Sequence, residues 1–207
     1  MSTMSLPTAV KDHHAAARRR LSSPERREQI LRAARRVVAE DGLQATTDQV
    51  ARAAGVSQPY VVRLFGTKRD LFVEVYREAA AAVVRALGSV PAGPDARDRM
   101  AAAYVALLAD RDLLRVFMHG FIAGADEEIG RIARHTLGEA YRLFEERVGG
   151  TPDEARQFVA FGMLINVLLA VDAPAHLGED PGLDGLIECT LKGAEGLDEA
   201  LLRADRA

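Results

Sequence analysis

The strongest constraint on the fold is a close series of helix start and stop signals in the first third of the chain. Each short apolar segment there ends at a glycine, which readily adopts the positive φ that closes a helix. Each following segment starts after a threonine or serine, whose side chain can cap a helix N-terminus. The spacing therefore allows only two short helices, over residues 47–54 and 58–65, before a longer one begins. The signals are Gly42, Thr46, Gly55, Ser57, Gly66 and Thr67.

The two short helices have the pattern of a helix-turn-helix. Gly55 lies where the turn between them needs a positive φ, and Ala51 is small where the two helices cross. Val56 and Val61 are expected to fill the space between the helices. The first turn of the second helix then faces outward. An α-helix presented in this way fits the DNA major groove, where its N-terminal residues reach the base edges.

One helix is predicted before this pair and one after it. Ser23 is expected to cap the first helix, with Pro24 at its first position. Thr67 is expected to cap a long helix over residues 68–87. Residues 1–22 are rich in basic side chains and lack apolar periodicity, so they are expected to form a disordered tail. Contact of this tail with the DNA minor groove is the alternative.

The rest of the chain predicts a helical body after a Gly- and Pro-rich linker over residues 88–94. No segment has the alternating pattern of a strand, and the abundance of Ala, Leu, Arg and Glu favours helix. We expect an all-α protein of about nine helices, with a helix-turn-helix domain over residues 23–70 and a ligand-binding and dimerisation body over residues 88–207. The helices of the body are predicted over Asp95–Asp110, Arg111–Ala123, Asp126–Val148, Pro152–Val171 and Leu183–Ala204.

Charge is divided unevenly along the chain. Residues 1–70 hold 13 Lys and Arg against 7 Asp and Glu, although the whole chain has a net charge of −3. A basic head on an acidic body predicts a polyanionic partner for the head alone. The alternative is a chance run of solvated surface arginines.

A set of positions in the head matches a known pattern: Ile30, Leu31, Ala34, Gly42, Thr46, Val50, Ala51, Ala54, Gly55, Val56, Ser57, Phe65, Gly66, Thr67, Lys68, Leu71 and Phe72. With this pattern, residues 26–78 resemble the N-terminal DNA-binding domain of the TetR/AcrR family of transcriptional regulators. The resemblance implies an all-α homodimer. Its first three helices would bind double-stranded DNA at a palindromic operator, and its fourth would connect them to a ligand-binding body.

The resemblance also implies which residues contact DNA. Thr46 and Thr47 lie at positions that contact phosphate through hydroxyl and backbone N–H groups. Lys68 lies at a position where the family has a lysine close to phosphate. Gln58 and Pro59 lie at positions that contact bases. Tyr60 and Arg63 lie at positions that contact either bases or phosphate.

The sequence departs from the family pattern within the second short helix. Many members have Tyr and His where this chain has Val62 and Leu64. Both of those polar contacts are therefore missing, and Tyr60 is expected to take over a phosphate or base contact.

Two helices of the body are expected to form the homodimer. The predicted helix 152–171 is apolar on nearly every side, and the predicted helix 183–204 carries one apolar stripe, so both need to be covered. Closure of the monomer core by these helices is the alternative.

A small hydrophobic ligand is expected in the body, because the candidate pocket residues are mostly apolar. An ordinary core position is the alternative for each of them. The candidates are Tyr104, Leu107, Phe117, Met118, Phe121, Tyr141, Phe144, Phe161 and Asn166.

The sequence contains none of the short motifs of phosphate-binding, serine-hydrolase, zinc-protease or dinucleotide-binding enzymes, so neither catalysis nor a cofactor is expected. His135 and Glu139 share a helix face, and a surface pair is favoured over a metal site.

Cys189 is expected to be a small core residue. No segment has the features of a signal peptide or a membrane span, so a cytoplasmic protein without a membrane partner is expected.

Together these observations predict a dimeric repressor that releases its operator when a small hydrophobic molecule binds the body. Two alternatives stay open. One is a DNA-binding regulator without a small-molecule ligand, controlled by a protein or acting as an activator. The other is a helical interaction module whose head does not bind DNA.

Overall fold

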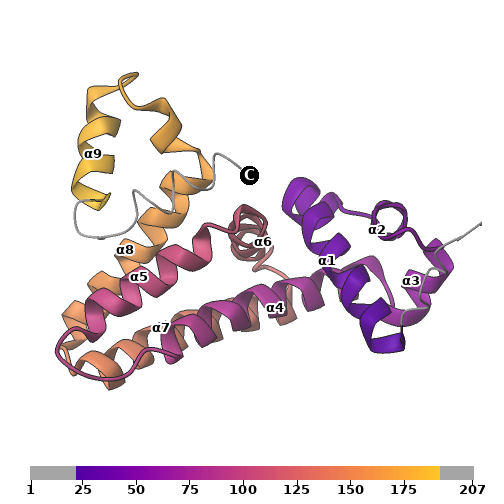
Figure 1. Ribbon diagram of the computed structural model, residues 1–207, viewed down its shortest axis with the longest axis horizontal. Coiled ribbons are helices and arrows are strands. Elements are labelled where there is room, and N and C mark those ends of the chain that lie inside the picture. Colours follow the sequence, from indigo (N-terminus) through magenta and orange to yellow (C-terminus); the bar gives the residue numbers. More distant parts are fainter. Residues whose placement is uncertain (1–21, 192–207) are drawn as a thin grey trace, which may run out of the picture.

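The computed structural model describes residues 22–191, and this part of the chain is all-α, as predicted (Figure 1). The predicted tail over residues 1–21 and the end of the last predicted helix, residues 192–204, lie outside the described residues. The helices are α1 (Ser23–Asp41), α2 (Thr47–Ala54), α3 (Gln58–Phe65), α4 (Lys68–Gly88), α5 (Ala96–Leu108), α6 (Arg111–Ile122), α7 (Glu127–Val148), α8 (Pro152–Ala170) and α9 (Pro181–Leu191), with short 3-10 turns η1 (Gly42–Gln44) and η2 (Ala173–His176).

The start of α1 differs from the prediction by one residue. Ser22, not Ser23, is the N-cap, because only Ser22 stands three residues before an acidic side chain. The Ser22 hydroxyl accepts a hydrogen bond from the Glu25 N–H, and the Glu25 carboxylate accepts one from the Ser22 N–H at 2.8 Å. This reciprocal pair is a capping box. The other predicted helix bounds that fall within residues 22–191 agree with the structure to within about two residues.

Helices α1, α2 and α3 form a small head at one end of the molecule (Figure 1). Its centre is fully apolar: Ile30, Val50 and Val61 from the three helices are each completely buried. Helix α4 leaves this head and continues into the body, where it lies along α7 and also contacts α5 and α6. The head and the body are therefore joined by one continuous helix.

The body is closed by α8, which packs on α7, and by α9 at the end remote from the head (Figure 1). Where α4 meets α6, the buried ring of Tyr76 lies directly on the backbone of Gly120. A Cβ atom at position 120 would overlap that ring. Glycine is required there because any side chain would push α4 and α6 apart.

The described helices include none that is both long enough and apolar enough to cross a membrane.

Candidate functional site

The turn between α2 and α3 has the geometry that the sequence predicts. Gly55 is left-handed, with φ 65° and ψ 37°, and ends α2. The Val56 N–H then donates to the carbonyl of Ala51 at 3.0 Å, which closes the turn. Ala51 is buried where the two helices meet. Because local hydrogen bonds and a packed centre fix this turn, α3 is held in one orientation relative to α2.

The outward side of α3 carries the residues predicted to contact bases. Gln58, Pro59 and Arg63 are exposed, and Tyr60 is half-buried. The Arg63 guanidinium lies over the Tyr60 ring, 4.9 Å from its centroid. This contact between residues one turn apart holds a cation and an aromatic ring together on the exposed surface.

The first turns of α2 and α3 are linked to each other. The Gln58 amide donates a hydrogen bond of 3.2 Å to the hydroxyl of Thr47, which lies in the first turn of α2. The structure therefore brings a predicted phosphate contact and a predicted base contact to one place on the surface.

Two further residues belong to this surface, and neither is among the predicted DNA contacts. Val62 is 43% exposed, an unusual position for an apolar side chain on a short helix. Ser57 occupies the predicted N-cap position of α3, but its hydroxyl makes no capping hydrogen bond. Val62 has a signal in the sequence, since it lies one helical turn after Gln58 and therefore on the same side of α3.

The remaining predicted phosphate contacts lie at helix starts. The Thr46 N–H and hydroxyl both donate to the Gln49 side-chain oxygen at 2.8 Å, so they are already used in a capping box. Lys68 is exposed at the first position of α4. Thr67 caps that helix through Asp70, and these hydrogen bonds lower the pKa of the Asp70 carboxyl.

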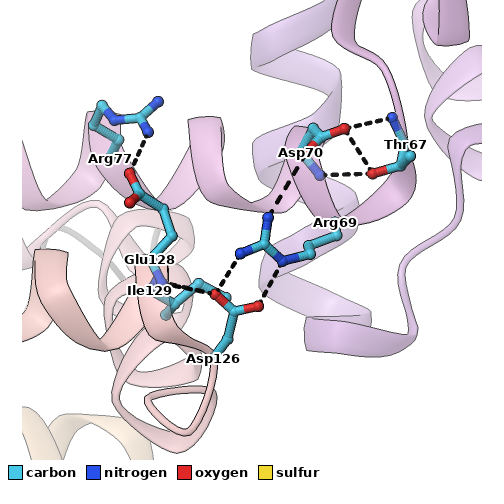
Figure 2. A network of polar contacts seen from close by, with 7 residues as sticks. All are labelled: Thr67, Arg69, Asp70, Arg77, Asp126, Glu128 and Ile129. Atoms are coloured by element: carbon cyan, nitrogen blue, oxygen red, sulfur yellow. Dashed lines mark hydrogen bonds and ion pairs between the residues drawn. The ribbon is translucent and has the colours of Figure 1, made fainter.

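Two ion pairs link the first half of α4 to the start of α7, as Figure 2 shows. The Arg69 guanidinium donates two hydrogen bonds to the Asp126 carboxylate, at 2.6 and 2.8 Å. About two turns further along α4, Arg77 donates to Glu128 at 2.9 Å. The pKa of Asp126 is lowered, first by the hydrogen bond from Arg69 and then by the backbone N–H of Ile129.

A partly open cavity of about 360 Å³ lies in the body and is lined by residues of α4 to α9. Most of its lining is apolar, and its polar groups come from α5, α7 and the start of α8. The lining includes Val83 and Leu87 of α4, Arg97, Asp98, Ala101 and Tyr104 of α5, Phe117 of α6, Thr136, Leu137 and Ala140 of α7, Gln157, Phe158, Val159, Phe161, Gly162, Met163 and Ile165 of α8, and Cys189 of α9.

Of the nine predicted pocket residues, the structure brings three to this cavity: Tyr104, Phe117 and Phe161. A fourth, Asn166, is completely buried behind it and accepts a hydrogen bond of 2.9 Å from the Tyr104 hydroxyl. Burial raises the pKa of Tyr104 to about 12. This buried pair fixes the Tyr104 ring at the cavity wall.

The other five predicted pocket residues do not line the cavity. Phe121 packs edge-on against Phe117, with ring centroids 4.9 Å apart, and Phe144 packs against Phe158 at the same distance. Leu107 and Met118 are partly buried against the core. Tyr141 lines a separate shallow hollow between α7 and α8. The polar lining groups Arg97, Asp98, Thr136 and Gln157 were missed, because no sequence pattern marks which polar residues of α5, α7 and α8 turn inward.

One contact connects the cavity to the helix that carries the head. Phe117 lies at the cavity wall on α6, and its ring centroid is 6.3 Å from that of Tyr76 on α4. Burial raises the pKa of Tyr76 to about 12, and its hydroxyl has no hydrogen-bond partner within residues 22–191. A shift of Phe117 would therefore press directly on α4.

Two other sequence expectations have clear outcomes. His135 and Glu139 form a surface pair with 3.7 Å between ring nitrogen and carboxylate, and Arg142 also binds that carboxylate. Between residues 22 and 191, no three metal-ligating side chains gather into a site.

The expectation for Cys189 is wrong: the thiol is exposed, because α9 turns this residue toward the cavity and not into the packed core.

Comparisons with known proteins agree with this architecture. Residues 30–75 match the family described as bacterial regulatory proteins, tetR family. A transcriptional regulator from Rhodococcus sp. Rha1 is 26% identical, with a TM-score of 0.61 over 84% of this chain and 98% of the other. The family and this regulator are regulatory proteins and not enzymes. No curated protein matches the sequence at a significant level.

Two further structures share the fold. The fatty acid degradation regulator FadR from Bacillus halodurans is 20% identical, with a TM-score of 0.58 over 86% of this chain and 98% of the other. The multidrug binding protein EbrR, complexed with imidazole, is 22% identical, with a TM-score of 0.57 over 88% of this chain and 89% of the other.

Proposed function

We propose that this chain, whose residues 30–75 match the TetR family of bacterial regulatory proteins, is a ligand-responsive repressor. In this proposal a dimer binds a palindromic operator in the cytoplasm through Gln58, Pro59, Tyr60 and Arg63. A small, mainly hydrophobic molecule in the body cavity then releases it. The observation that carries the proposal is that α4 belongs to both parts: Lys68 at its start is on the head, and Val83 and Leu87 near its end line the cavity.

Ligand release follows from differential binding. A molecule that fills the cavity changes DNA affinity only if it binds the conformation without DNA more tightly. The contact from Phe117 to Tyr76 offers a direct route, because a ligand that displaces Phe117 also displaces α4. The cavity volume of about 360 Å³ falls within the range of small-molecule sites. It favours this proposal over a regulator without a ligand.

The proposal is tested in two steps. DNA bound by the full-length protein is selected from a random pool, and the sequences are examined for a two-fold repeat. Apolar and aromatic compounds are then screened for release of the selected DNA. Selection of no preferred sequence contradicts the DNA-binding role. Release by none of the compounds, with intact DNA binding, contradicts the ligand-responsive role.

Substitutions in the head are expected to separate base contacts from phosphate contacts. Arg63→Ala is expected to weaken binding to the selected DNA by about 1–3 kcal/mol and to relax the preference at one base position. Lys68→Ala is expected to weaken binding to all sequences alike and to reduce the slope of log K against log salt by about 1. Fluorescence anisotropy across a salt series measures both effects.

Arg115→Ala, an exposed arginine on α6, is the matched control, because it changes the net charge equally without altering the head. An affinity for Arg63→Ala within twofold of the wild type would show that Arg63 is a solvated surface residue.

We also propose that α8 and α9 form the dimer interface. Val167 on α8 and Leu186 on α9 remain 46% and 43% exposed in the single chain, and Val171 after α8 is 61% exposed. Light scattering at micromolar concentration is expected to give twice the mass of one chain. The double substitution Val167→Asp and Leu186→Asp is expected to give one chain mass, because it would place carboxylates in an apolar interface. A wild-type protein of one chain mass contradicts this assignment.

A further inference from the structure

A second cavity lies at the junction of the head and the body, separate from the one described above. Its volume is about 510 Å³, within the range of small-molecule sites. Its walls come from the end of α1, η1 and the first turns of α2 and α4 on the head side. The end of α6 and the start of α7 form the body side. Figure 2 shows one edge of this junction, where Arg69 reaches across to Asp126.

The walls of this junction cavity are mainly apolar, and two of its apolar side chains are unusually exposed. Leu43 on the head side is 44% exposed, and Ile122 on the body side is 78% exposed. Single exposed apolar residues are common on protein surfaces. Here both line the same hollow, with the buried Leu71 and Phe72 behind them. An apolar group placed between them would remove both side chains from water.

The charged residues that line the junction cavity are Lys68, Arg69 and Asp126. Arg69 and Asp126 neutralise each other through two hydrogen bonds. The Asp126 carboxylate also accepts hydrogen bonds from the backbone N–H groups of Glu128 and Ile129, so its acceptor capacity is used within the protein. Within residues 22–191 no carboxylate pairs with Lys68. The lining therefore carries one uncompensated positive charge.

We propose that the junction cavity binds a small anionic amphiphile. Its apolar chain would lie between Leu43 and Ile122, and its carboxylate would pair with the Lys68 ammonium. The first cavity differs in this respect, because its charged groups, Arg97 and Asp98, have opposite signs. The two cavities thus select different ligand chemistries.

The position of the junction cavity has a consequence for DNA binding, and this step rests on the proposed function. Thr47 and Lys68, two of the residues proposed to hold DNA phosphate, also line the cavity. A carboxylate on Lys68 occupies the same donor as a phosphate. An amphiphile bound here competes with DNA directly and needs no signal from the body cavity.

Calorimetry of the full-length protein without DNA tests the binding step. The probe is sodium decanoate below its micellar concentration, and 1-decanol is the neutral molecule of matched chain length. Decanoate is expected to bind about tenfold more tightly than decanol, because only decanoate carries the charge that Lys68 recognises. Equal affinities, or no binding of decanoate, would overturn the proposal.

Substitutions then assign the bound decanoate to this cavity. Ile122→Gln and Lys68→Gln are each expected to weaken decanoate binding by about tenfold. Leu177→Gln is the matched control, since Leu177 is 58% exposed but lies outside both cavities, and it is expected to leave decanoate binding unchanged. Binding that survives Ile122→Gln unchanged would place decanoate elsewhere and overturn the assignment.

Displacement of DNA by decanoate is measured separately, so that failure of the decanoate site and failure of the proposed function can be told apart. Decanoate is expected to displace DNA from the wild type and to lose this effect in Ile122→Gln, which itself binds DNA normally. Calorimetric binding without any DNA affinity would contradict the proposed function and leave the decanoate site intact. Decanoate binding that leaves DNA affinity unchanged would overturn the competition.

Discussion

Replacement of Gly120 by alanine is expected to destabilise the protein by about 1–3 kcal/mol, which is the usual cost of forcing extra atoms into a packed core. The new Cβ would overlap the ring of Tyr76, which is completely buried. Urea unfolding at one fixed protein concentration measures the change in the free energy of unfolding.

The chain offers a matched control for this substitution. Gly138 is also a helical glycine, but it is exposed. Among the described residues, no atom beyond its chain neighbours and the nearby backbone of α7 lies within 4 Å of the position of a Cβ. Gly138→Ala is expected to stabilise the protein by about 0.5–1 kcal/mol, because alanine loses less backbone entropy in a helix. Equal free energies of unfolding for the two variants would contradict the close contact between α4 and α6.

The companion substitution Tyr76→Leu shows whether the effect belongs to this contact. On its own it is expected to be destabilising, because it leaves a cavity. In the double variant with Gly120→Ala, the smaller side chain makes room for the new methyl group. The double variant is therefore expected to be more stable than the sum of the two single effects predicts.

Alkaline pH is expected to give the second large effect. Burial raises the pKa of Tyr76 and of Tyr104 to about 12, above the value of 10.0 for an unperturbed tyrosine. Between these values the unfolded chain loses the two protons while the folded protein keeps them. Stability is therefore complete below pH 10 and falls as the pH rises from about 10 to 12. Each tyrosine contributes a loss of up to about 3 kcal/mol over this window.

Urea unfolding between about pH 9 and 11 measures this dependence, and Tyr76→Phe is the informative variant. The Tyr76 hydroxyl has no hydrogen-bond partner among residues 22–191, so its removal is expected to cost little at neutral pH. It is expected to reduce the alkaline loss of stability by about half. Tyr104→Phe differs, because it also leaves the buried Asn166 oxygen without its hydrogen bond. The same pH dependence in wild type and Tyr76→Phe would contradict the burial of that hydroxyl.

The head could be predicted from the sequence because its signals are local. Capping residues, glycines and apolar spacing lie within a few residues of the turns that they determine, and the bounds of α2 follow from them. The one-residue difference at α1 has the same origin. Two serines compete for the cap, and Glu25 decides between them because it stands three residues after Ser22.

The body cavity could be predicted only in part, because its lining comes from six helices. An apolar residue such as Phe144 has the same helical spacing whether it faces a cavity or another ring. Neither the close approach of Gly120 to Tyr76 nor the exposure of Cys189 has a local signal. Both depend on how distant helices pack, which a single sequence does not specify.

Helix α4 runs without interruption for 21 residues, which corresponds to a rod about 30 Å long. Tilting a rod of that length by about 5° at the cavity end moves its other end by roughly 3 Å. In a dimer, two heads that move in opposite directions change their separation by about twice that amount. Half-sites on DNA are spaced by the fixed pitch of the double helix, about 34 Å. A tilt too small to unpack the body would therefore put both heads out of register with the grooves at once.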